Sequence, residues 1–376
     1  MNSYSDTIHG NGSEQLLFPF RLEIDPMESL LLVNFEKDAD TLYTGFEPQV
    51  FDDDINGSGH LVIGWRKDKK VDVYHQKSLH PNPEKYSIAG AGLNKMIAVD
   101  MNPAQNNMNE TGVHAHYRFK DILGRDIEIF INEKNPKKRK PFGILAPMGD
   151  AATHPFSMPL VLLQDFYFVR KNQTEIVVSI DQKRHRVDEF PVPMDFQQMT
   201  FLRYSPKPLI ATLNPAHKGL LEVWSLKPGQ PVFEKGNCSY EIEWSSQIPC
   251  VSSVRVENKV HPLTMRFEPA FPSLNHLPPK TRQQGTFRIS GHESVGVISG
   301  RYRVESRSND VAVSIVPSGG WHPKVTKLST WLLFNAVKVF KQWPKTYRWD
   351  AILRMEADET WHMESKWIRT GKILKD

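Results

Sequence analysis

Pairs of short segments with alternating apolar and polar residues, joined by polar turns, recur along this chain. Each pair reads as strand, turn and strand, and the turns are rich in Lys, Asp, Asn, Ser and Glu. The pairs are 60–65 with 71–75, 160–169 with 174–180, 301–304 with 311–316, and 347–355 with 361–368. Period-two alternation bounded by polar turns is typical of antiparallel sheet. The sequence therefore predicts an all-β fold.

An all-β chain must protect the unpaired edges of its sheets, and closing a sheet into a barrel removes those edges. A chain of 376 residues is long enough for two such domains. The Pro- and Gly-containing stretch 227–231 is the best candidate for a boundary between them. We therefore expect two antiparallel β-barrel or curved β-sandwich domains, at residues 14–226 and 232–376.

One stretch, residues 327–343, predicts a long helix in the second domain. Leu328, Trp331 and Leu332 recur there at helical spacing, which indicates an amphipathic helix packed on the sheet. Pro344 ends the helix, because the residue before a proline disfavours the helical conformation.

The sequence of the hairpin 113–133 predicts which residues of its two strands lie opposite each other. Alternation points Phe119 and Ile127 inward together, and the same register pairs opposite charges on the other face. The predicted outward pairs are Lys120 with Asp126, Arg118 with Glu128, and His114 with Asn132. The same reasoning at the C-terminus pairs Trp349 with Trp367, Met355 with Trp361, and Asp350 with Lys366.

His114 and His116 lie two residues apart on one face of this hairpin, a spacing that offers two imidazoles to one metal ion. His154, in a turn-rich segment, is a candidate third ligand. The two histidines are similar to the His-x-His motif of cupin barrels, but the similarity does not extend further. Aromatic and basic residues replace the carboxylate expected a few residues after the second histidine. The alternative is a solvated or ion-paired face.

Tryptophan is concentrated near the C-terminus, and aromatic rings in a β scaffold can line an apolar ligand cavity. The candidate ligand-binding residues are Trp331, Tyr347, Trp349, Trp361 and Trp367. The alternative is that these rings fill the core of a wide barrel.

Polar groups within apolar strands are candidates for acid–base chemistry. Asp165 interrupts the apolar strand 160–169, and Glu241 flanks Ile242. A buried carboxyl must be paired or have a shifted pKa, so Asp165, Glu241 and His154 are the candidate catalytic residues. An ion pair between Asp165 and Arg203 is the simplest structural explanation for Asp165.

The basic stretch 134–141 reads as an exposed loop tip, or as a segment that contacts phosphate or a nuclear-import receptor. The formal net charge of +4 is too small to predict nucleic-acid binding. No apolar run approaches the roughly 20 residues of a transmembrane helix, and the first residues lack the features of a signal peptide. With two cysteines, we expect a cytoplasmic protein with reduced thiols.

The chain contains no Gly-x-Gly-x-x-Gly, no phosphate-binding loop, no Gly-x-Ser-x-Gly and no His-Glu-x-x-His. We therefore expect no cofactor. The repeated meanders are similar to lipocalin-like barrels, including tandem barrels that act on isoprenoids, as an analogy at the level of the fold alone.

The expected function is binding of a largely apolar small molecule in a β-barrel cavity, by a cofactor-independent isomerase, cyclase or hydratase. The alternatives are a non-catalytic lipid or carbohydrate binding protein, and a metal-dependent β-barrel enzyme that uses the His-x-His pair. The sequence leaves the oligomeric state open.

Overall fold

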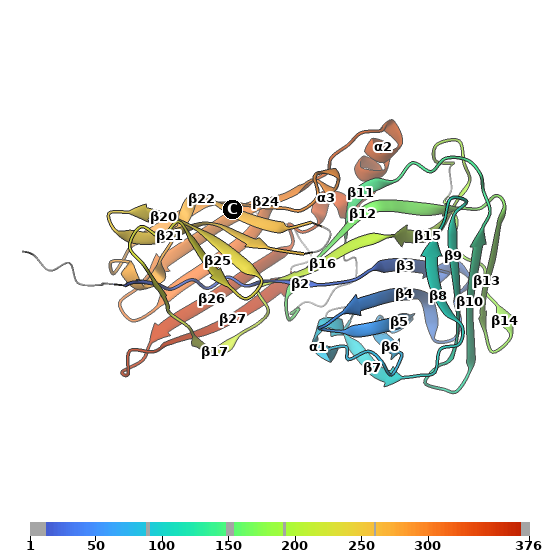
Figure 1. Cartoon of the computed structure of the whole chain (residues 1–376), viewed down its shortest axis with the longest axis horizontal. Helices are drawn as coiled ribbons and strands as arrows, with labels where there is room; N and C mark the ends of the chain where they lie inside the picture. Colours follow the sequence, from blue (N-terminus) through green and yellow to red (C-terminus); the bar gives the residue numbers. More distant parts are fainter. Residues whose placement is uncertain (1–12, 88–90, 148–153, 191–192, 259–260, 370–376) are drawn as a thin grey trace, which may run out of the picture.

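The computed structural model describes residues 13–87, 91–147, 154–190, 193–258 and 261–369. The fold is mostly β, with 58% strand and 8% helix, and it contains several antiparallel sheets. The all-β prediction is confirmed. Two lobes lie side by side along the long axis of the molecule (Figure 1).

The first half of the chain forms most of one lobe from two sheets. The long sheet contains, in order, β2 (Leu22–Asp25), β16 (Lys207–Leu213), β12 (Met158–Arg170), β15 (Met199–Ser205), β3 (Ser29–Asn34), β4 (Tyr43–Asp53), β5 (Gly57–Arg66), β6 (Val71–His75) and β7 (Leu93–Ala98), with β11 (Phe142–Ala146) paired to β12. The outer sheet contains β14 (Lys183–Arg184), β13 (Thr174–Ile180), β10 (Asp126–Glu133), β9 (Val113–Lys120) and β8 (Ala104–Met108). A core that includes Tyr117, Ile129 and Leu202 lies between these two sheets.

The second half forms the other lobe from one ten-stranded sheet, which we call the half-barrel sheet. Its order is β17 (Lys218–Leu221), β27 (Trp361–Arg369), β26 (Tyr347–Met355), β25 (Val311–His322), β24 (Val297–Ser306), β23 (Arg282–Ser290), β22 (Leu263–Pro272), β21 (Ile248–Val256), β20 (Cys238–Ser245) and β19 (Val232–Lys235). A separate pair joins β1 (Glu14–Leu16) to β18 (Trp224–Leu226). The helices are α1 (Pro83–Tyr86), α2 (Leu328–Ala336) and α3 (Lys338–Gln342), with single 3-10 turns η1 (Glu36–Asp38), η2 (Leu274–His276) and η3 (Glu293–Val295).

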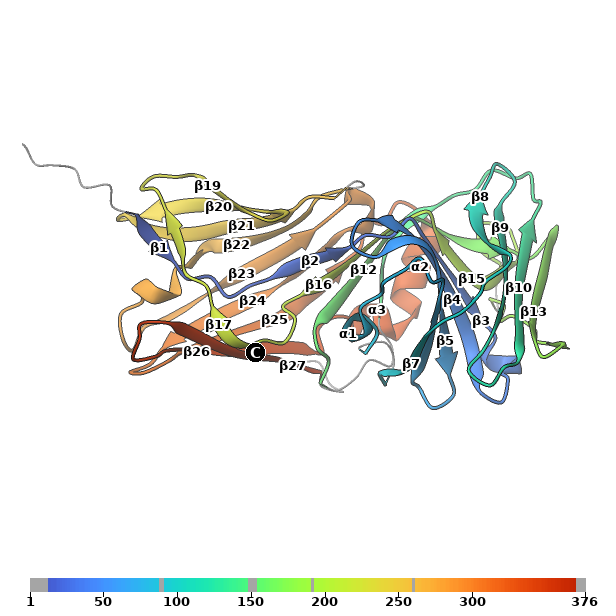
Figure 2. The same ribbon diagram turned by 60° about the horizontal axis from the view of Figure 1, so that its bottom comes forward.

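The half-barrel sheet curls around the N-terminal segment that joins β1 to β2 (Figure 2). Phe18 lies 5.8 Å from Tyr240 on β20, and Phe20 lies 5.4 Å from Trp349 on β26, between ring centroids. In a flat sheet β20 and β26 would be about 29 Å apart, at about 4.8 Å per strand. Adjacent rings of one segment therefore contact strands that only strong curvature brings together.

The predicted domain boundary falls between strands of the same sheet. β17 and β19 lie on either side of residues 227–231, and both belong to the half-barrel sheet. The first residues of the chain pack inside that sheet, and one apolar core runs from it to the long sheet. The segment from β1 to β2 therefore connects the two lobes, because it packs inside the half-barrel sheet and then continues into the long sheet.

The predicted helix 327–343 is wrong in its middle, where Val337 has extended backbone (φ −91°, ψ 110°) and separates α2 from α3. Phe334 of α2 and Phe340 of α3 both pack on Trp321, with ring centroids 4.9 and 5.8 Å away. The break lets both helices place a ring on the same tryptophan. No helix in the described part of the chain has the length and hydropathy needed to cross a membrane.

Candidate functional site

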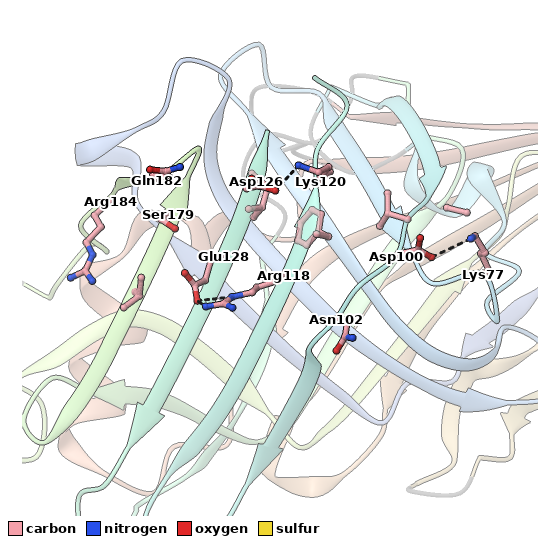
Figure 3. Close-up of a pocket in the computed structure, with 15 residues that line it drawn as sticks. Lys77, Asp100, Asn102, Arg118, Lys120, Asp126, Glu128, Ser179, Gln182 and Arg184 are labelled. Atoms are coloured by element: carbon pink, nitrogen blue, oxygen red, sulfur yellow. Dashed lines mark hydrogen bonds and ion pairs between the residues drawn. The ribbon is translucent and has the colours of Figure 1, made fainter. Parts of the chain in front are cut away.

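An open groove of about 900 Å³ lies on the face of the outer sheet that points away from the core (Figure 3). Three ion pairs line it: Lys120 with Asp126 at 2.7 Å, Arg118 with Glu128 at 2.5 Å, and Lys77 with Asp100 at 3.1 Å. Because these pairs are largely solvent-exposed, each contributes little free energy. The groove is a solvated, charge-matched surface without a buried acid or base among its lining residues.

The two predicted metal-binding histidines continue the same face beyond the groove. His114 lies 3.4 Å from the Thr111 hydroxyl, and the His116 Nε2 lies 3.4 Å from a Glu128 oxygen. His154 is exposed. In the described residues, no group of three His, Cys, Asp or Glu side chains is placed to hold a metal ion.

The predicted catalytic carboxylates lie on different sheets. Asp165 sits at a left-handed position in β12 (φ 50°), half exposed, and pairs with Lys207 at 3.5 Å. The expected ion pair with Arg203 is wrong, because Arg203 faces Asn34 instead, at 2.5 Å. Glu241 is exposed on β20, opposite Ser253. No hydrogen bond or ion pair of the described structure connects Asp165, Glu241 and His154.

The predicted ligand-binding aromatics are divided between core and surface. Tyr347, Trp349 and Trp367 are fully buried inside the half-barrel sheet, where Phe20 packs on Trp349. The Tyr347 hydroxyl and Trp349 Nε1 are buried without a hydrogen-bond partner. Trp361 is partly buried, whereas Trp331 is 50% exposed on α2. The burial of the first three fits the alternative, core filling.

A different polar cluster lies on the face of the long sheet that points away from the outer sheet. The strand registers place one row of residues across β12, β15, β3, β4, β5 and β6. Arg203 pairs with both Phe168 and Leu32, and Glu47 pairs with Ile63, which pairs with Val73. Leu30 opposite Gln49 and Val33 opposite Phe46 set Leu32 opposite Glu47. Glu47 and Arg203 are thus two charged residues in an otherwise apolar row.

Glu47 is buried, with 8% of its surface exposed. Its two oxygens accept hydrogen bonds from Gln49 Nε2 at 2.9 Å and Trp65 Nε1 at 3.0 Å. Burial raises the pKa of Glu47 to about 7, and these hydrogen bonds and the more distant charge of Arg203 only partly oppose that shift. A carboxyl group that titrates near neutrality can both donate and accept a proton.

Arg203 lies two strands from Glu47, about 10 Å between backbones by ordinary strand spacing. Its guanidinium stacks on Phe201, with the central carbon 4.8 Å from the ring centroid. Burial lowers the pKa of Arg203 to about 10, so the group stays charged at neutral pH. Arg203 Nε and Gln49 Oε1 are buried without a hydrogen-bond partner, which leaves one donor and one acceptor free on this face.

The surroundings of Glu47 are apolar and incompletely covered. Leu32, Trp65 and Phe201 on this face are only partly buried. Tyr86 of α1 is close enough that the Glu47 charge contributes, after burial and Asp25, to raising the tyrosine pKa. Apolar side chains beside a few polar groups, one of them with a perturbed pKa, are features that small-molecule sites share.

Alternation alone does not reveal Glu47 as a site residue, because it assigns polar residues to the solvent side. The available signal was the segment 43–51, in which apolar residues occupy both alternating sets and leave Glu47 and Gln49 no solvent face. Comparisons of the chain with protein-family models, curated proteins and solved structures find no match.

Proposed function

We propose that this protein binds a largely apolar small molecule against the Glu47 face of the long sheet and acts on it by proton transfer. The observation that carries the proposal is Glu47, a buried carboxyl with a pKa of about 7 and no cation within ion-pair distance in the described structure. The reaction classes that fit are those expected from the sequence, isomerase, cyclase or hydratase. The residue that carries the chemistry is Glu47 in place of Asp165, Glu241 or His154.

In an isomerisation, the Glu47 carboxylate would take a proton from one carbon of the ligand as that C–H bond breaks. The electron pair forms a double bond as the original double bond shifts, and the Glu47 carboxylic acid returns the proton to a second carbon. Atoms and electrons balance without a redox partner. The Arg203 charge favours negative charge that develops on an oxygen substituent of the ligand.

Binding without turnover is the alternative, and one observation favours it. Both Glu47 oxygens already accept a hydrogen bond, from Gln49 and Trp65, so the carboxyl has a satisfied structural role as well. Under this alternative, Arg203 Nε and Gln49 Oε1 fix the orientation of a ligand that leaves unchanged.

The first experiment is organic extraction of the purified protein, followed by mass spectrometry, and incubation of the extracted compound with fresh protein. Glu47→Gln keeps the shape of the side chain, and Glu241→Gln is the matched control on an exposed strand position. Product formation that Glu47→Gln abolishes and Glu241→Gln leaves intact supports proton transfer. Retained binding without product in the wild type supports the alternative, and turnover that survives in Glu47→Gln contradicts the proposed role.

A further inference from the structure

Helix α2 stands above β11 on one long side of the molecule (Figure 1), and it presents an apolar stripe to solvent. Leu328, Trp331 and Leu332 are 73%, 50% and 52% exposed, and their spacing puts them on one face of the helix. The opposite face is buried through Thr330 and Phe334, and Phe334 packs on Phe142 of β11. The exposed stripe is therefore a surface that the fold itself leaves uncovered.

A second exposed ring lies beside this stripe. Phe196 is 96% exposed at a turn between Met194 and Gln197. The turn is held to α2, because the Ser329 hydroxyl donates to Asp195 at 3.1 Å. We call Phe196, Leu328, Trp331 and Leu332 the apolar cap. Two segments more than 130 residues apart in the sequence thus contribute exposed apolar side chains to one place.

Positively charged segments lie beside the apolar cap. The Lys327 ammonium donates to the carbonyls of Lys140 and Pro141, at 2.8 and 3.2 Å, which joins the basic loop before β11 to the start of α2. Segments 137–140 and 324–341 contain eight cationic residues and no Asp or Glu. Arg139 has a buried Nη1, and its charge acts on the buried Tyr204, so it points elsewhere. We call the other seven the basic rim: Lys137, Lys138, Lys140, Lys324, Lys327, Lys338 and Lys341.

The charge of the basic rim is unpaired and segregated. Its side chains form no ion pair with any residue that the structure describes. Because the whole chain carries a formal net charge of +4 and the rim carries +7, the rest of the chain carries −3. Asp195 contributes one negative charge beside the cap. A protein of mixed charge thus has one strongly positive region.

We propose that the apolar cap and the basic rim dock this protein onto the surface of an anionic lipid bilayer. Lysines near an anionic leaflet are attracted to its negative surface potential, and tryptophan prefers the level of the lipid headgroups. A short helix with an exposed Trp and Leu stripe inside a lysine rim inserts its apolar side chains at that level while the lysines contact the headgroups. The proposal is independent of the proposed function, because neither Glu47 nor Arg203 belongs to the cap or the rim.

The helix sequence alone does not reveal this surface. The segment 328–336 contains no basic residue, and three of the rim's cations come from residues 137–140, far away in the chain. The contact of Lys327 with Lys140 and Pro141, and the packing of Phe334 on Phe142, bring the two segments together. Charge complementarity is what selects a lipid surface over an apolar protein partner for the cap.

The test is co-sedimentation of the full-length protein with vesicles of phosphatidylcholine alone or with about one third phosphatidylserine. We expect binding to the anionic vesicles only, weakening as salt is raised. Lys137→Gln/Lys138→Gln/Lys140→Gln should lower the partition coefficient about 100-fold, since each lysine near such a surface contributes about fivefold. The matched control is Lys67→Gln/Lys70→Gln/Lys95→Gln, three exposed lysines of the long sheet, which should bind as the wild type does.

The apolar contribution is tested with Trp331→Ala/Leu332→Ala, against Ile352→Ala/Met355→Ala as exposed apolar residues of the half-barrel sheet. The first pair should lose at least tenfold in binding, and lipids brominated at the first acyl carbons should quench wild-type fluorescence more than that of Trp331→Phe. Circular dichroism checks that each variant is folded. The proposal is overturned by equal binding to both vesicle types, by no binding at low salt, or by a wild-type dimer that Trp331→Ala/Leu332→Ala converts to monomer without affecting vesicle binding.

Discussion

Among the described residues of the first half of the chain, two glutamates are buried, and their surroundings differ in one respect. Glu133, at the end of β10, is fully buried and accepts from Arg170 Nε at 2.7 Å, from the Val113 amide at 3.0 Å and from the Tyr167 hydroxyl. Glu47 on β4 accepts only from neutral donors, Gln49 and Trp65. One carboxylate has a cation in contact, and the other has none.

The two buried acids differ in what they can do: Glu133 has a structural role, whereas Glu47 is available for proton transfer. Arg170 also donates to the carbonyls of Thr111, Lys137 and Asn135, so the Glu133–Arg170 pair ties three chain segments together, 111–113, 133–137 and 167–170. Such a pair is stable only as a pair, because each charge alone is costly to bury. Glu47 without a cation can change its protonation state near neutral pH. Aromatic content does not distinguish the regions, since rings surround both.

Removing the cation from Glu133 should have the largest effect. Arg170→Met keeps the length of the side chain but leaves a buried carboxylate and three carbonyls unpaired, and we expect a loss of about 3–5 kcal/mol in the free energy of unfolding. Arg118→Met is the matched control, because it breaks an exposed Arg–Glu pair on the same sheet. Urea denaturation measures both, and a similar small loss in the two variants would contradict the distinction.

Glu47→Gln should change the pH dependence of stability. The folded-state pKa of Glu47 is raised, so the group favours folding fully below its unfolded pKa of 4.5, and this contribution is lost as the pH rises through about 7. The variant, which is neutral throughout, should match the wild type near pH 4.5 and exceed it at pH 8 by about 2–3 kcal/mol. Denaturation at both pH values measures the difference in free energy of unfolding between the variant and the wild type. A difference that does not change with pH would contradict the raised pKa of Glu47.

Gln49→Leu should increase the pH dependence of stability that comes from Glu47, whereas Glu47→Gln removes it. It removes one hydrogen bond to Glu47, which favours the carboxylate, so the pKa of Glu47 should rise further. The stability difference between pH 5 and pH 8 should grow by about 1 kcal/mol relative to the wild type. Leu30→Val, a change beside Gln49 on the neighbouring strand, is the control that leaves the pH dependence unchanged.

The smallest effect is expected in the groove of the outer sheet. Lys120→Ala breaks the pair with Asp126, in which both side chains are about two thirds exposed, and should cost less than about 0.5 kcal/mol. The loss should vanish at high salt because such pairs are screened. A loss comparable to that of Arg170→Met would mean that the groove is more than a solvated surface.

The sequence predicted local pairing correctly where two strands are joined by a short turn. The structure pairs Lys120 with Asp126, Arg118 with Glu128 and His114 with Asn132, as expected. The C-terminal pairs of Trp349 with Trp367, Met355 with Trp361, and Asp350 with Lys366 are confirmed as well. A short turn leaves few registers open, and alternation selects among them.

Arrangements that join distant segments were not predictable in the same way. Glu47 and Arg203 are 156 positions apart and share a row only because β3 pairs with both of their strands. We expected Asp165 to pair with Arg203 across neighbouring strands, whereas Asp165 has a left-handed backbone beside a register shift in β12 and pairs with Lys207. Alternation gives the face of a residue within a strand, and the order of strands in the sheet requires the tertiary structure.

The segment inside the half-barrel sheet also has a consequence for the order of events during synthesis. Phe18 and Phe20 are made more than 200 residues before Tyr240, Phe267 and Trp349, which pack against them. Until those residues have been made, the two rings lack these contacts, which favours association with other chains or chaperones. The core of this lobe can therefore be completed only after the strand that carries Trp349 has been made.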